Sequence, residues 1–166
     1  FGFTDQEVRE LLAYYDAADH YDVVKKWYNG YQFGSRNVYC PWDVLNYCDR
    51  IRSEPHVQPE NYWMHTSSND AVKRFIQESA NAATKREIEC LVAGEVITKK
   101  IYPELTYAEM YQSIDHIWSL LYATGYLTQR GQVKGRQVPL AIPNQEIRDI
   151  FETQIMEFFQ ENVRGD

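Results

Sequence analysis

The side chains that could carry chemistry in this chain are its histidines and cysteines, together with a surplus of carboxylates. The histidines and cysteines are His20, His56, His65, His116, Cys40, Cys48 and Cys90. No two histidines have the H-x-x-x-H spacing that places two ligands on one helix face, and the cysteines form no C-x-x-C pair. Because zinc sites usually leave such a local ligand pair in the sequence, we predict no metal site.

Three kinds of catalytic motif are also absent from the sequence. A phosphate-binding loop of the form G-x-x-x-x-G-K-[ST] and a G-x-S-x-G nucleophile elbow do not occur. The carboxylates nearest Lys99 and Lys100 are Glu95 and Glu104, and their offsets do not match the E-x-K of a metal-dependent nuclease. We therefore predict no catalytic residue, no cofactor-binding residue and no enzymatic activity for this chain itself.

Composition limits the possible classes of protein further. The chain has 166 residues, a formal net charge of −7 and 44% hydrophobic residues. An acidic balance argues against a protein that coats nucleic acid, and the apolar content is sufficient for a folded core. No apolar run approaches the roughly 20 residues of a membrane helix, and three cysteines without a pattern favour a reducing compartment. We expect a cytoplasmic protein without a membrane contact.

One short segment reverses the acidic balance. Residues 126–142 carry a local charge of +3, whereas residues 143–166 carry −4. The basic side chains are Arg130, Lys134 and Arg136. They are the candidate nucleic-acid contact, and the alternative is a solvated hairpin tip. The helix expected before them offers Asp115, His116 and Ser119 instead of basic residues, which disfavours reading of base sequence.

The elements that must position these residues are mostly helices in the first part of the chain. Thr4 and Glu7 form a capping box at the start of a helix. A second helix is predicted over 22–28, ending at Asn-Gly, and a small hairpin near 31–39. Pro41 suits the first position of a third helix.

Further helices and a strand pair are predicted in the second part. Capping clusters at 67–70 and 84–87 each precede an apolar helical pattern. A helix is predicted from Ser113 to Gly125, followed by strands over 126–129 and 137–142 and by a long apolar helix after Pro143. The order helix, strand, glycine turn, strand, helix is typical of a winged-helix element. We predict a mainly α fold with small β-hairpins: a helical subdomain over 1–105 joined to a winged-helix-like subdomain over 106–166.

Aromatic residues are concentrated in the first subdomain. Twelve of the 24 aromatics lie between Tyr14 and Trp63. Tryptophan and tyrosine are good interface anchors, so the cluster is either a binding surface or a core built from short elements with bulky filler.

Several stretches together resemble one family of bacterial proteins. They are F-G-F-T-D-Q-E-V at 1–8, K-W-Y-N-G-Y-Q-F-G at 26–34, V-Y-C-P-W at 38–42, Y-W at 62–63 with T-S-S-N-D at 66–70, I-W-S-L-L at 117–121 with T-G-Y-L at 124–127, and P-N-x-E-I-R at 143–148. The chain is similar over nearly its whole length to the AAA-ATPase-like proteins that often carry a C-terminal nuclease-like domain of the PD-(D/E)XK type. Cys40 departs from the pattern, which has Asn, a better helix cap, before the proline.

The resemblance implies a place for this chain within a longer protein. In the family a P-loop ATPase core precedes the F-G-F-T segment, and the nuclease-like domain follows the final helix. The chain would then be the middle region, and the ATP and Mg²⁺ of the parent protein would bind to the upstream core. The candidate packing surface toward that core is Trp27, Tyr28, Asn29, Gly30, Tyr31 and Phe33.

Three functions follow as expectations. The first is a non-catalytic lid or regulatory module that packs on the nucleotide-binding core and reports its state by rigid-body movement. The second is a winged-helix nucleic-acid-binding module that uses the basic segment, although three phosphate contacts would bind only weakly. The third is a protein–protein interaction module.

Overall fold

The computed structural model describes residues 2–65, 73–74, 76–77 and 81–157. Within them helices predominate, and two small antiparallel sheets complete the fold, which confirms the predicted mainly α class with small β-hairpins. The capping cluster at 67–70 and the last apolar residues of the final helix, Phe158 and Phe159, lie outside the described residues.

The first part of the chain is three helices and one hairpin. Its elements are α1 (Asp5–Tyr14), η1 (Ala18–His20), α2 (Tyr21–Tyr28), β1 (Tyr31–Phe33), β2 (Arg36–Val38), α3 (Pro41–Ile51) and η2 (Tyr62–His65). The predicted capping box is confirmed: the Glu7 amide donates to Thr4 Oγ1 at 3.2 Å, and the Thr4 amide donates to Glu7 Oε1 at 3.0 Å. Two orphan amides at the start of α1 are thereby satisfied.

These helices surround a first hydrophobic core. Its buried members are Val8, Leu12, Ala17, Val24, Tyr28, Tyr39, Val44, Tyr47, Cys48, Ile51, Val57 and Tyr62. Many of the clustered aromatics are therefore core filler, with rings packed edge to face or tilted, as between Tyr28 and Tyr47 at 6.0 Å. A backbone bridge between Phe3 and Tyr39 closes the start of the chain onto the hairpin.

The second part of the chain packs helices on a three-stranded sheet. Its elements are α5 (Ala82–Val92), β3 (Ile97–Lys100), α6 (Tyr107–Met110), η3 (Ile114–His116), α7 (Ile117–Ala123), β4 (Thr128–Gln129), β5 (Gln137–Ala141), α8 (Gln145–Ile150) and the π-helix η4 (Phe151–Ile155). The strand order is β3-β5-β4, and β5 is antiparallel to both neighbours. Ile97 is paired with Leu140, and Thr128 with Ala141.

A second hydrophobic core lies between this sheet and its helices. Its buried residues extend from Ile76 to Ile155 and include most of α7. The last buried residue of the first core is Tyr62, and the first of the second core is Ile76, so the two parts divide between them. The boundary predicted from the sequence, between residues 105 and 106, would instead assign α5 and β3 to the first part. Strand β3 belongs with the second core because its ladder partner is β5.

Two helix predictions differ from the structure in detail. Helix α5 begins at Ala82, because Asn81 is its N-cap and accepts from the Thr84 amide at 2.9 Å. Thr84 is consequently a buried residue of the first turn and not a cap. The final helix widens into a π-turn after Ile150, in which Phe151 and Ile155 are both buried.

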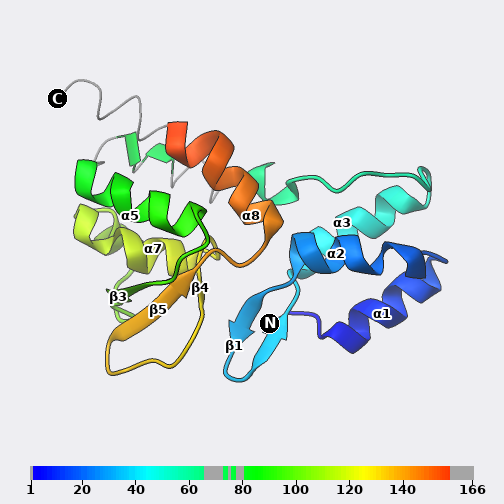
Figure 1. Ribbon diagram of the computed structural model, residues 1–166, viewed down its shortest axis with the longest axis horizontal. Helices are drawn as coiled ribbons and strands as arrows, with labels where there is room; N and C mark the ends of the chain where they lie inside the picture. The colour runs from blue at the N-terminus through cyan, green and yellow to red at the C-terminus, as the bar shows by residue number, and fades with distance from the viewer. Residues whose placement is uncertain (1, 66–72, 75, 78–80, 158–166) are drawn as a thin grey trace.

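Figure 1 shows the two parts of the molecule side by side. Helices α1, α2 and α3 form one group, and α5, α7 and the three-stranded sheet form the other. Helix α8 contacts α2, and β1 contacts β4, so these two pairs of elements lie where the parts meet. We call this contact region the junction; it is formed by residues 29–32, Asp43, 61–63, 125–130 and 143–149.

Candidate functional site

The loop between α2 and β1 forms one side of the junction. Asn144 Nδ2 donates to the carbonyl of Asn29 at 2.8 Å, and Arg130 Nη2 donates to the carbonyl of Gly30 at 3.0 Å. The Gln32 amide donates to Thr128 Oγ1 at 2.9 Å. Three backbone groups within residues 29–32 of the first part are thus bonded to side chains of the second.

Gly30 allows the loop between α2 and β1 to lie very close to the backbone of Pro143. Its φ of +97° lies in the left-handed region, and a Cβ at this position would lie 2.0 Å from the carbonyl oxygen of Pro143. A side chain would therefore collide with backbone and not with a movable group. The Asn-Gly pair that the sequence marks as a helix end also makes the contact between the two parts possible.

A second segment of the first part crosses the junction at 61–63. Asn61 Nδ2 donates to Asp149, and the Trp63 amide donates to Glu146 Oε2 at 3.1 Å. The Trp63 ring packs edge to face on Tyr126 with centroids 6.2 Å apart.

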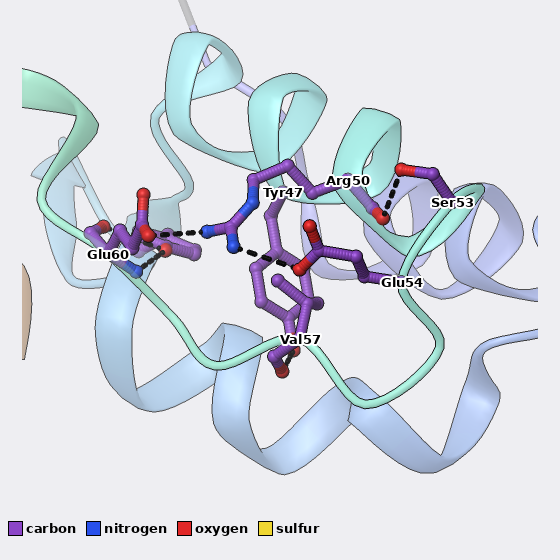
Figure 2. Close-up of polar contacts among 7 residues, drawn as sticks. Tyr47, Arg50, Ser53, Glu54, Val57 and Glu60 are labelled. Carbon is purple, nitrogen blue, oxygen red and sulfur yellow. Dashed lines mark hydrogen bonds and ion pairs between the residues drawn. The ribbon is translucent and has the colours of Figure 1, made fainter.

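Arg50 and Tyr28 hold the loop that leads into this segment. Arg50, near the end of α3, pairs with Glu54 at 3.2 Å and with Glu60 at 2.8 Å, as Figure 2 shows. The Tyr28 hydroxyl donates to the Glu60 carbonyl at 3.0 Å and accepts from the Glu60 amide at 3.1 Å. These contacts determine where the chain enters η2 and hence where the Trp63 amide points.

Two carboxyl groups meet at the centre of the junction. Asp43, in the first turn of α3, and Glu146, in the first turn of α8, are both fully buried. Their side chains are within hydrogen-bond contact of each other. No N–H or O–H group of the described residues donates to either oxygen of Asp43 or to Oε1 of Glu146. The thiol of Cys40, a weak donor, is the polar group beside Asp43.

Burial dominates the electrostatics of this pair. It raises the pKa of Asp43 and the pKa of Glu146, because a carboxylate loses its hydration when it is enclosed. The neighbouring Asp43 raises the pKa of Glu146 further, whereas the hydrogen bond with Glu146 lowers the pKa of Asp43. The backbone amides of Tyr62 and Trp63 act in the lowering sense on Glu146. The two acids are therefore difficult to ionise together.

The predicted packing surface contributes to both the interior and the exterior. Tyr28 is fully buried in the first core, and Asn29 and Gly30 are bonded across the junction. Trp27 and Tyr31 are partly buried, and Phe33 is 58% exposed. Of the six residues, Phe33 therefore offers the most surface to a partner, and Trp42 and Leu45 on α3 are further exposed apolar residues.

The predicted nucleic-acid contact is partly engaged within the chain. Arg130 bonds to Gly30 across the junction, and Arg136 pairs with Glu104 at 2.6 Å and lies over the Tyr102 ring. Lys134 is exposed. The neutralisation of Arg136 by Glu104 leaves less positive charge on this segment than the sequence alone indicates.

Cavities among the described residues adjoin these elements, and two of them exceed 500 Å³. The larger, about 600 Å³, lies beside the junction and is lined by residues that include Tyr31, Phe33, Trp63 and Tyr122. Its neighbouring polar groups are bonded within the chain: Ser119 accepts from the Tyr102 amide, and Thr124 donates to the Leu120 carbonyl. The smaller, about 520 Å³, lies in the first part, and its lining includes His20 and His56.

The carboxyl pair was not identified from the sequence, although a signal is present. Asp43 lies four residues before Tyr47 and eight before Ile51, so it occupies the apolar face of α3. Glu146 similarly lies four residues before Ile150 on α8. An acid at a position where the helical period requires an apolar residue predicts a buried carboxyl.

Within the described residues, no group of three or more histidine, cysteine or acidic side chains could hold a metal ion. In the same part of the chain, no helix has both the length and the apolar character needed to cross a bilayer. Compared with protein-family models, curated proteins and solved structures, this chain has no significant match.

Proposed function

We propose that this chain is a non-catalytic lid or regulatory module of a larger AAA-ATPase-like protein and packs on a nucleotide-binding core. One observation carries the proposal: the motif residues of the resemblance converge on the junction. Asn29, Gly30, Trp63, Asn144 and Glu146 all belong to those motifs, and all of them make contacts between the two parts. Motifs that join two cores favour a module that moves as one body.

The second part supports a winged-helix assignment. Its order is helix, strand, two helices, strand, turn and strand, with sheet order β3-β5-β4. We assign this order to a winged helix, in which α7 would be the third helix and the turn between β4 and β5 the wing.

The apolar side chains Phe33, Trp42 and Leu45 are the surface that we assign to the ATPase core. They are 58%, 54% and 49% exposed, which is unusual for residues of this size. Phe33 and Trp42 come from the motif stretches 26–34 and 38–42, so the same stretches that form the junction also supply this surface. A partner would gain apolar burial there at little cost in desolvated polar groups.

Nucleic-acid binding by the wing is less well supported. A winged helix that reads DNA inserts its third helix in the major groove, but Ile117, Trp118, Ser119, Leu120 and Leu121 of α7 are all buried. A salt titration of DNA binding, with Arg130, Lys134 and Arg136 neutralised, tests this alternative. A steep salt dependence that these changes abolish would favour it.

The lid function is tested by hydrogen exchange on the parent protein and on the isolated chain. We expect peptides covering Phe33 and Trp42 to exchange more slowly in the parent, because the core covers them. Peptides covering Tyr14, which is 82% exposed, are the internal control. Phe33→Ser should remove the protection, and Val133→Ser, a change of an exposed side chain on the wing, should not. Equal exchange in the two proteins, or tight binding of MgATP by the isolated chain, would contradict the proposal.

A further inference from the structure

The two carboxyls at the junction connect parts of the chain that are far apart in sequence. Asp43 lies in the first turn of α3 in the first part, and Glu146 lies in the first turn of α8 in the second. Because both carboxyls are buried where α3 and α8 meet the junction, the state of this pair affects how firmly the two parts hold together. The function proposed above uses Glu146 only as a contact between the two parts and assigns no role to the ionisation of either carboxyl.

Three of the four carboxyl oxygens of Asp43 and Glu146 lack an N–H or O–H hydrogen-bond donor among the described residues. Glu146 Oε2 accepts from the Trp63 amide, but Glu146 Oε1 and both oxygens of Asp43 receive no N–H or O–H donor from the described residues. A buried carboxylate oxygen without a donor is costly. One proton between the two carboxyls would make their contact a hydrogen bond and would leave the pair with a single negative charge.

No basic side chain among the described residues takes the place of this proton. The titratable groups that interact with the pair are Cys40 at the N-cap of α3, Tyr31 from β1, Tyr62 from η2 and Tyr28 from α2. None of them is positively charged, and no lysine or arginine acts on either carboxyl within the described residues. The basic group that interacts with Tyr62, Arg50, is paired with Glu54 and Glu60. Burial raises the pKa of both carboxyls, in agreement with this arrangement.

We propose that Asp43 and Glu146 share one proton at neutral pH and that release of this proton opens the junction, so that the pair is a pH-sensitive latch between the two parts of the chain. When the proton leaves to solvent, two negative charges face each other in an enclosed site, and separation of the two parts lets water reach them. This inference does not depend on the lid function and concerns the chain by itself.

Infrared spectroscopy tests the shared proton directly. The carbonyl stretch of a protonated carboxylic acid is separate from that of a carboxylate. We expect the protonated band at pH 7 in the wild-type chain and in Glu152→Gln, a change of an exposed acid on the same final helix. The double variant Asp43→Asn, Glu146→Gln should lack it. Absence of the band from wild type would overturn the proposal.

Hydrogen exchange tests the opening. Peptides covering Gln32 and Trp63, whose amides donate across the junction, should exchange faster as the pH rises, after correction for the chemical exchange rate. Because one proton is released on opening, the open population should grow by up to about tenfold per pH unit. The double variant should show no such rise, and Glu152→Gln should behave as wild type. Exchange independent of pH, or an equal rise in the double variant, would overturn the latch.

Two further measurements keep the test decisive. If the double variant does not fold, the single variants Asp43→Asn and Glu146→Gln serve instead. Each leaves an amide that can donate to the remaining carboxyl, and either should reduce the rise of the exchange rate with pH.

A bound cation would supply the same missing charge as a proton. Elemental analysis that found one cation per chain, lost on mutation of the pair, would therefore overturn the shared proton.

Discussion

At the scale of single residues, Asp5 shows how one side chain ties three elements of the first part together. It accepts from Tyr21 Oη at 2.5 Å, from Tyr39 Oη at 2.8 Å and from Arg9 Nε at 2.8 Å. Burial opposes ionisation, but these hydrogen bonds outweigh it and lower the pKa of Asp5 to about 2. The same residue is the first of α1, where a negative charge is also favourable.

The lowered pKa of Asp5 makes the free energy of unfolding depend on pH in acid. The folded chain holds the proton on Asp5 less tightly than the unfolded chain, so the stabilisation is complete above pH 4 and is lost as the pH falls toward 2. Because Asp5 is about half exposed, we expect a contribution of about 1 kcal/mol after solvent screening. Asp5→Asn should lose this part of the acid dependence in urea denaturation between pH 2 and 6. Asp22→Asn, at an exposed position of α2, should keep it, and equal curves for the two variants would contradict the assignment.

At the scale of elements, the close approach of the α2–β1 loop to α8 depends on Gly30. Gly30→Ala places a Cβ 2.0 Å from a backbone oxygen at a φ of +97°, so we expect a loss of about 3 kcal/mol or more in the free energy of unfolding. Gly34 in the same hairpin has a φ of +61° and open space around it. Gly34→Ala should therefore cost only about 1 kcal/mol, the strain of the backbone alone. Equal losses in chemical denaturation would show that the junction does not restrict Gly30.

Asn144 both begins α8 and joins the two parts. Its Oδ1 accepts from the Ile147 amide at 3.1 Å, and its Nδ2 donates to the Asn29 carbonyl at 2.8 Å. Asn144→Ser keeps a cap but loses the second bond, and should cost about 1 kcal/mol. Asn144→Ala loses both and should cost about 2 kcal/mol. Thermal or urea unfolding of the pair separates the two roles, and equal losses would mean that the cross-junction bond contributes nothing.

Short sequence patterns were sufficient to predict most helices and strands, but not how these elements pack together. The capping box at Thr4, the hairpin after Gly30 and the helix that ends before Gly125 all depend on residues within a few positions of one another, and the structure confirms them. The start of α5 was misplaced because two competing caps, Asn81 and Thr84, lie three residues apart.

The site was harder to predict than the elements, for a physical reason. Asp43 and Glu146 are 103 positions apart, and nothing in the sequence around either one indicates the other. Their periodicity predicts burial of each, but only the packing of α8 on the first part brings them together. The packing surface assigned to 27–33 likewise combined residues that the fold separates into core, junction and exterior.

At the scale of the whole molecule, stability should depend on pH through two opposing groups of carboxyls. Asp5 loses its contribution below pH 4, whereas the carboxyl pair acts in the opposite direction. Since the folded chain binds the shared proton more tightly than the unfolded chain does, the free energy of unfolding should fall as the pH rises above the usual range of a carboxyl. The slope should approach about 1 kcal/mol per pH unit between pH 5 and 8, close to the value for one whole proton.

The matched measurement is urea denaturation of wild type, Glu152→Gln and the double variant Asp43→Asn, Glu146→Gln across pH 3 to 9. Contributions of all other titrating groups are common to these proteins and cancel in the differences. We expect the free energy of unfolding of the double variant not to decline above pH 5. The variant should still lose stability in acid through Asp5. Its advantage over wild type in the free energy of unfolding should grow as the pH rises. Glu152→Gln should follow wild type throughout, because its carboxyl is exposed. A constant difference between wild type and the double variant across this range would mean that the buried pair exchanges no proton on unfolding, and the latch would then have no energetic basis.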